Sequence, residues 1–109
     1  MTQADRRDRT VLDEAKALVH GDRNAAYGSP ADDFGRAAEM LTGLLRDKLK
    51  PGERIATSDV AKIQIVVKLS RLMHKPKRDS WTDIAGYAET GDWCDEVEDQ
   101  HMRKVNEEA

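Results

Sequence analysis

The sequence predicts an all-α protein, a bundle of four to five helices that is completed by oligomerisation. Apolar residues recur three or four positions apart in successive segments, and short links that carry glycine or proline separate these segments. A chain of 109 residues with only three prolines and seven glycines leaves room for long helices but builds only a small core. We divide it into a frayed N-terminus (1–9), a helical domain (10–90) and an acidic helical segment (91–109).

The first two helices have clear start signals. In "TVLDEAKALVHG", Thr10 can cap a helix, with Asp13 three residues later, and Gly21 can end it. In "SPADDF", Ser29 occupies the cap position and Pro30 the first turn. This second helix runs on until "KPGER" stops it.

A third helix is expected from a cap at Thr57 or Ser58 to about Met73. Its apolar residues cover most of its circumference, which predicts a central helix, although "IQIVV" alone can be read as a strand. A fourth helix begins near Asp79. Gly91 is expected to break or bend it, and the remainder is helical.

Charge is unevenly distributed along the chain. Residues 89–109 hold eight acids and two bases, a net charge of −6, so residues 1–88 carry +3 of the total of −3. The acidic end disfavours duplex nucleic acid as a partner, because phosphates are repelled there. A single cysteine, no signal-peptide pattern and no apolar run of membrane-spanning length predict a cytoplasmic protein with no membrane partner.

Two polar stripes carry the most chemistry. A basic stripe on the third helix and an acidic stripe on the fourth fall at helical spacing, and the tight turn between these helices makes them antiparallel. The stripes form either a salt-bridge network or a site for Mg²⁺ and phosphate. The basic stripe comprises Gln64, Lys68, Arg71 and Lys75, and the acidic stripe comprises Asp79, Asp83, Gly86 and Thr90.

Two further segments can contribute to such a site. The loop "HGDRNAAYGSP" brings His20, Arg23 and Tyr27 to a helix N-terminus, where an anion can bind, or it is a solvated connector. On the second helix, Asp33 and Glu39 either complete a carboxylate cluster with the acidic stripe or belong to a solvated face.

Three segments carry a family resemblance: "HGDR…YGSP…F", "SDVAKIQIVVKLSRL" and "DSWTDIAGYAE". Together they resemble a family of small phage and prophage proteins of unknown function, over about residues 20–89. That family is in turn distantly similar to the all-α MazG-like nucleoside triphosphate pyrophosphohydrolases, in which acidic residues on two helices bind Mg²⁺.

The resemblance implies specific roles. Asp83 resembles the aspartate that ends the second acidic motif of these enzymes, and Asp79 lies one residue from the other acidic position, where this chain has Ser80. Lys68 and Arg71 resemble the basic residues before that motif. The first motif departs, since the several glutamates of the enzymes are matched here by Asp32, Asp33 and Glu39, with Arg36 between them.

Three functions follow as hypotheses. The first is a Mg²⁺-dependent nucleotide pyrophosphohydrolase, with the metal on Asp79, Asp83, Glu39 and Asp33. The second is a non-catalytic nucleotide-binding relative. The alternative is a phage accessory protein that binds a host or viral protein through its helical surfaces. In each case we expect a homo-oligomer.

Overall fold

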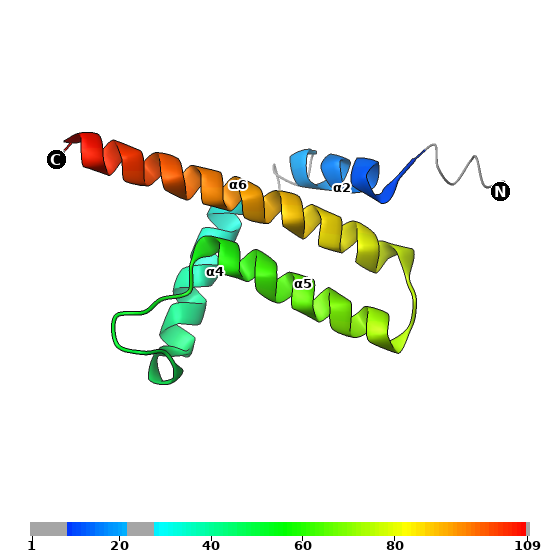
Figure 1. Ribbon diagram of the computed structural model, residues 1–109, viewed down its shortest axis with the longest axis horizontal. Coiled ribbons are helices and arrows are strands. Elements are labelled where there is room, and N and C mark those ends of the chain that lie inside the picture. Colours follow the sequence, from blue (N-terminus) through cyan, green and yellow to red (C-terminus); the bar gives the residue numbers. More distant parts are fainter. Residues whose placement is uncertain (1–8, 22–27, 109) are drawn as a thin grey trace.

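The fold was obtained as a computed structural model, which describes residues 9–21 and 28–108 (Figure 1). It contains four α-helices, α2 (Val11–His20), α4 (Pro30–Leu44), α5 (Thr57–His74) and α6 (Arg78–Glu108), and a short 3₁₀ helix, η1 (Arg46–Lys48). The prediction of an all-α fold is confirmed, and no strand occurs in the described residues. None of the helices in these residues has the length and apolar character needed to cross a membrane.

The helix starts were predicted well at two of three positions. The hydroxyl of Thr10 accepts the N–H of Asp13, and the carboxylate of Asp13 accepts the N–H of Thr10, which is a complete capping box. Ser29 caps α4 by accepting the N–H of Asp32 at 3.1 Å. The expected cap at Thr57 or Ser58 is wrong. The N-cap of α5 is Ala56, whose N–H is accepted by the first-turn carboxylate of Asp59 at 2.9 Å.

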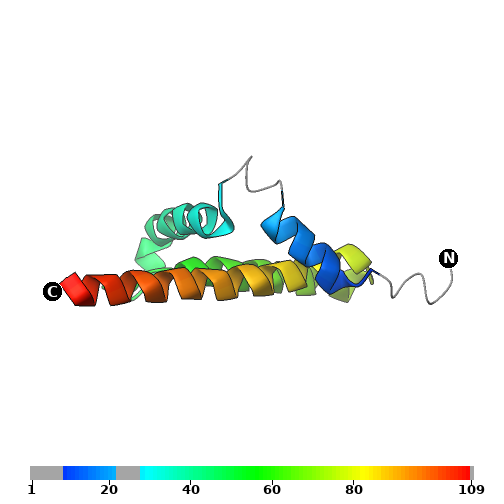
Figure 2. The same cartoon turned by 90° about the horizontal axis from the view of Figure 1, so that it is seen from above.

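The helices form two layers. The antiparallel pair α5 and α6 makes one layer, and both remaining long helices lie on the same side of it, α2 on α6 and α4 across α5 and α6 (Figure 2). The turn between α5 and α6 spans only residues 75–77, so the two helices are forced side by side. The opposite side of this layer has no covering helix within the described part of the chain (Figure 2).

Two glycines of α6 permit the close approach of its neighbours. A Cβ on Gly91 would lie 3.3 Å from the Cβ of Ala61 on α5, and a Cβ on Gly86 would lie 3.6 Å from Cγ2 of Val19 on α2. The expected break at Gly91 does not occur, since α6 continues through it as one helix of 31 residues. The cost of a glycine inside a helix, about 1 kcal/mol, is offset here by tight packing.

Polar contacts hold α2 against the start of α6. The carboxylate of Glu14 accepts hydrogen bonds from Arg78 and Thr82, both at 3.0 Å, and these bonds lower the pKa of Glu14. At the other end of α2, Nε2 of His20 lies 2.8 Å from Oε2 of Glu89. The ring of His20 also stacks on Trp93, with centroids 5.1 Å apart. The two ends of α2 are therefore fixed to α6 mainly by polar and ring contacts.

The core is thin. The buried hydrophobic residues in the described part of the chain are all small or medium in size: Ala15, Val19, Ala38, Val60, Ala61 and Cys94. Burial raises the pKa of the Cys94 thiol. The prediction that α5 is surrounded by other helices is wrong within one chain, because one side of it is uncovered and Val66 and Met73 are exposed. Leu44 and Trp81, expected in the core, are exposed as well.

The packing of α2 on α6 yields a prediction for Gly86. Gly86→Ala should be tolerated and raise the free energy of unfolding by up to about 1 kcal/mol, because its methyl group fits at contact distance and alanine favours the helix. Gly86→Leu should lower it by roughly 1–3 kcal/mol, because the larger side chain displaces α2. Chemical denaturation measures both.

Gly43→Leu provides the matched control, since a Cβ at Gly43 meets no heavy atom within 4 Å. It should leave stability unchanged or slightly raised. Equal losses for the leucine variants at positions 43 and 86 would contradict the packing argument.

Candidate functional site

A basic pocket lies at the end of the α5–α6 pair, beside the turn. It is a cavity of about 470 Å³ that contains four cationic side chains and two carboxylates. Its charged residues are Lys68, Arg71, Lys75 and Lys77, with Asp79 and Asp83, and His74, Pro76 and Ser80 complete the lining. Of these four cations, only Lys68 forms an ion pair with a described residue. The pocket thus keeps positive charge that its own carboxylates do not neutralise.

The Lys68–Asp83 ion pair joins the two stripes. Nζ of Lys68 lies 2.8 Å from Oδ2 of Asp83, and the side chains of Lys68 and Asp83 are only 14% and 33% exposed. A pair so shielded from water interacts more strongly than one on an open surface. The lysine side chain is therefore held at the inner end of the basic pocket.

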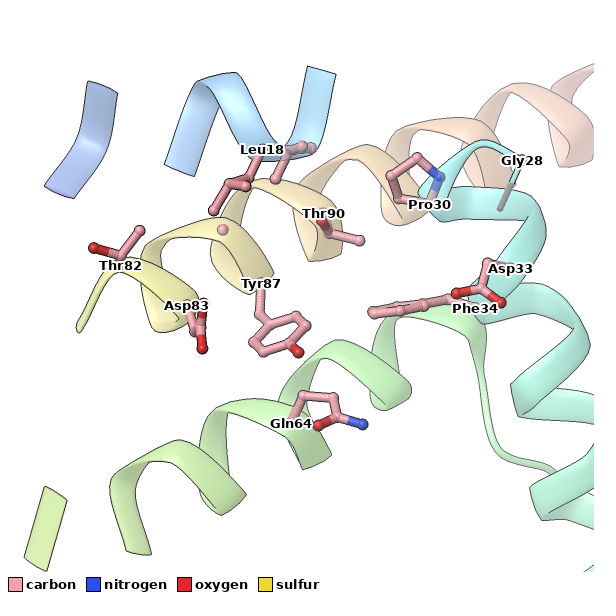
Figure 3. A pocket seen from close by; sticks show the side chains of 12 residues that line it. Leu18, Gly28, Pro30, Asp33, Phe34, Gln64, Thr82, Asp83, Tyr87 and Thr90 are labelled. Atoms are coloured by element: carbon pink, nitrogen blue, oxygen red, sulfur yellow. The ribbon is translucent and has the colours of Figure 1, made fainter. Parts of the chain in front are cut away.

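A second cavity of about 450 Å³ adjoins the first and shares Asp83 with it. We call it the aromatic pocket because Phe34 of α4 and Tyr87 of α6 stack in it, with ring centroids 6.2 Å apart (Figure 3). Polar groups surround the rings, and α2 closes one side. The remaining lining residues are Leu18, Val19, Gly28, Pro30, Asp33, Gln64, Thr82, Gly86 and Thr90.

The structure brings the two predicted stripes to the same pair of cavities. Along α5, Gln64 lines the aromatic pocket, whereas Lys68 and the two cations after it line the basic pocket. Along α6, Asp79 lines the basic pocket and Thr90 the aromatic one. Both of the readings left open by the sequence therefore have a physical basis, because a salt bridge forms and cavities flank it.

The other predicted site residues are scattered. Asp33 lines the aromatic pocket and lies 3.7 Å from Arg36, whereas Glu39 is exposed on α4 and lines neither cavity. His20 lines neither cavity and instead contacts Glu89. Arg23 and Tyr27 lie outside the described residues.

The carboxylates do not form a metal cage by themselves. Within residues 9–21 and 28–108, no three His, Cys, Asp or Glu side chains come together as a metal-binding group. Asp79 and Asp83 nevertheless face one cavity, one helical turn apart. Mg²⁺ often takes only one or two protein carboxylates and completes its coordination with substrate phosphates and water. The residues present fit an ion that arrives together with a phosphate ligand.

Sequence reasoning missed the aromatic pocket. Phe34 is the only phenylalanine of the chain, and its spacing predicted an ordinary core residue. Tyr87 carried a usable signal, because it follows Asp83 by four residues and thus extends the acidic stripe. Thr82 carried none, since only the packing of α2 places it at the cavity.

These features define a small all-α protein with a charged pocket and an aromatic pocket between its layers. The family model for a domain of unknown function, DUF6378, matches residues 10–95, and the chain belongs to this family. Over 80 residues, covering 72% of the chain, it is 39% identical to the Gene 55 protein of Mycobacterium phage D29. These residues cover 49% of that protein, so the chain spans about half the length of the curated relative it matches. No solved structure matches.

The Lys68–Asp83 pair can be measured by a double-mutant cycle with Lys68→Met and Asp83→Asn. Because the pair is shielded, we expect a coupling free energy of about 1 kcal/mol in chemical denaturation. The matched control is the exposed pair Lys62–Asp59 at 3.2 Å, for which about 0.3 kcal/mol is expected. Equal couplings for the two pairs would show that the first is not shielded.

Proposed function

We propose that this protein binds a nucleotide, with the phosphates in the basic pocket and the base in the aromatic pocket. The observation that supports this most strongly is the junction of the two cavities at Asp83. A nucleotide has an anionic end and a planar aromatic end, and adjoining pockets of these two kinds are complementary to it. The resemblance to MazG-like proteins points to the same class of ligand.

Phosphate oxygens would be held by the cations of the basic pocket. Arg71 and Lys75 have no ion-pair partner among the described residues, so a phosphate does not have to displace one. Guanidinium and ammonium groups form charge-assisted hydrogen bonds with phosphate. Lys68 can transfer its ammonium group from Asp83 to a phosphate oxygen, and this leaves the Asp83 carboxylate available to a cation.

Mg²⁺ would be held between the phosphates and the carboxylates of Asp79 and Asp83. Once bound, the ion supplies charge neutralisation at the phosphoryl oxygens. The protein residues position it at the inner end of the basic pocket.

The base would lie against the stacked rings of Phe34 and Tyr87. Aromatic rings stack on any nucleobase, and such a contact is worth about 1–3 kcal/mol in nucleic-acid complexes. The amide of Gln64 and the carboxylate of Asp33 line the same cavity and can hydrogen-bond to the edge of a base. Stacking gives affinity there, and the polar groups give selectivity.

Pyrophosphohydrolase activity is the second candidate function. It is favoured by the two carboxylates one turn apart at the phosphate end of the site. The same arrangement also serves a protein that binds a nucleotide without cleaving it, so binding is the broader proposal.

Binding is tested by calorimetric titration of a panel of nucleoside mono-, di- and triphosphates with MgCl₂. Arg71→Ala should weaken the binding of triphosphates by roughly 10- to 100-fold, since a hydrogen bond to a charged group is worth about 1.5–3 kcal/mol. Phe34→Ala should weaken nucleotides but not inorganic triphosphate, because only the base contacts the ring. Lys48→Ala, which removes an exposed cation from η1, is the control.

Two results would contradict the proposal. One is the absence of binding for every nucleotide with and without Mg²⁺. The other is equal affinity for Arg71→Ala and Lys48→Ala, which would place any ligand outside the basic pocket.

Catalysis is tested separately by release of pyrophosphate from the nucleotides that bind. If the protein is an enzyme, Asp83→Asn should reduce turnover by at least about 100-fold, because it removes a carboxylate from the phosphate end of the site. Asp33→Asn, at the base end, should change nucleotide preference more than rate. Binding without turnover would identify a non-catalytic relative.

A further inference from the structure

One side of the α5–α6 layer exposes a continuous set of apolar side chains. On α5, Val66, Leu69 and Met73 are 63%, 46% and 87% exposed and lie within about 60° of one another around the helix. On α6, Trp81 is 53% exposed and Ala88 lies on the same side of that helix. We call this surface, formed by Val66, Leu69, Met73, Trp81 and Ala88, the uncovered face.

The uncovered face points away from the two pockets. Met73 lies about 180° around α5 from Gln64, and Trp81 lies about 180° around α6 from Thr90. Gln64 and Thr90 line the aromatic pocket, beneath α2 and α4. Both of these helices lie on the pocket side of the layer (Figure 2). The apolar residues are therefore on the side that no described helix covers.

We propose that the uncovered face binds the uncovered face of a second copy, which makes the protein a two-fold symmetric dimer. Each copy would bring an antiparallel helix pair, and the two pairs would form a four-helix bundle. This inference rests on exposure and charge and does not depend on nucleotide binding.

Charge complementarity favours a second copy over an unrelated partner. On α6, the uncovered face continues into Asp92, Asp95 and Asp99, which lie within about 60° of Trp81 and Ala88. At the other end of the face, the turn carries Lys75 and Lys77, whose side chains form no ion pair with a described residue. The face is thus apolar in the middle, acidic at one end and basic at the other.

A two-fold axis through the middle of the face pairs these ends. With the axis near Ile84, the turn at Lys77 lies about 10 Å to one side, and Asp92 and Asp95 lie about 12–16 Å to the other. Rotation by 180° therefore brings the turn of each copy close to the aspartates of its partner. A surface that is complementary to its own rotated copy is what a symmetric dimer requires.

The size of the face also suits a stable dimer. α5 has 18 residues and is about 27 Å long, and two packed helices are roughly 20 Å wide. This footprint of about 500 Å², enlarged by projecting side chains, approaches the ~800 Å² that each partner contributes to a standard interface. The thin core gives a reason for the association, because no Leu, Ile, Met, Phe or Trp is among the buried residues of the described chain.

Sedimentation equilibrium of the full chain without nucleotide tests the dimer directly. The expected mass is twice the 12.3 kDa of one chain at micromolar concentration. The double variant Val66→Glu and Leu69→Glu should weaken dimerisation at least about 100-fold, because it places four charges in the interface. Leu44→Glu, which alters an exposed leucine at the end of α4, should leave the mass unchanged.

Charge reversal tests the register and remains decisive if the double glutamate variant fails to fold. Asp92→Lys with Asp95→Lys in one chain, and Lys75→Glu with Lys77→Glu in another, should each weaken the homodimer about tenfold or more. An equimolar mixture of the two chains should form a heterodimer, because both salt-bridged ends are then complementary again.

Several outcomes would overturn the proposal. These are a monomer at every concentration, a dimer sensitive to Leu44→Glu but not to the change at Val66 and Leu69, or a mixture that forms no heterodimer. A monomer that binds a different host or phage protein through this face would assign the face to that partner instead.

Discussion

The packing of α5 against α6 is the constraint on which the rest of this structure depends. A turn of three residues forces the helices together, and Gly91 allows α6 to approach Ala61 with a gap that a side chain would close. The same pairing brings Lys68 within 2.8 Å of Asp83. Because the layer formed by these helices is flat and two-sided, α2 and α4 can cover only one side of it. The pockets lie on the covered side, and the exposed apolar residues lie on the other.

The Lys68–Asp83 pair links stability with ligand binding. A half-buried lysine needs an anion nearby, since the interior does not solvate its charge. In the absence of a ligand, Asp83 supplies that anion. A phosphate can replace it, and Asp83 is then matched by a cation that the phosphate brings. The salt-bridge and ligand-site hypotheses therefore describe two states of the same group of charges.

The sequence predicted those features that depend on neighbouring residues. The caps at Thr10 and Ser29 and the two stripes were readable because each depends on spacing along one helix. The cap of α5 was misassigned, because three polar residues compete there and Asp59 is the one whose carboxylate reaches the N–H of Ala56. The effect of Gly91 was misjudged for another reason. A glycine interrupts a helix only when nothing compensates its cost, and the contact with Ala61 is invisible in one helix alone.

The aromatic pocket and the exposure of α5 lay beyond the reach of the sequence. Phe34 and Tyr87 are far apart in the chain, and only the angle at which α4 crosses α6 brings their rings together. Apolar residues around α5 predicted a central helix, but periodicity cannot distinguish a side buried by the same chain from one buried by another. Within one chain that side is exposed, so the prediction holds only if a second copy covers it.

If both proposals hold, the turn at Lys75 and Lys77 connects them. Its cations would face phosphate on one side of the layer and the aspartates of a partner at the other. Neutralising them by one anion weakens their attraction for the second, so dimerisation would lower the affinity for phosphate unless Arg71 and Lys68 provide most of it. Thermodynamic linkage makes this coupling reciprocal, so a bound nucleotide would weaken the dimer by the same factor. The position of Arg71 and Lys68, farther along α5 from the turn, argues that the coupling is modest and that the two sides of the layer act largely independently.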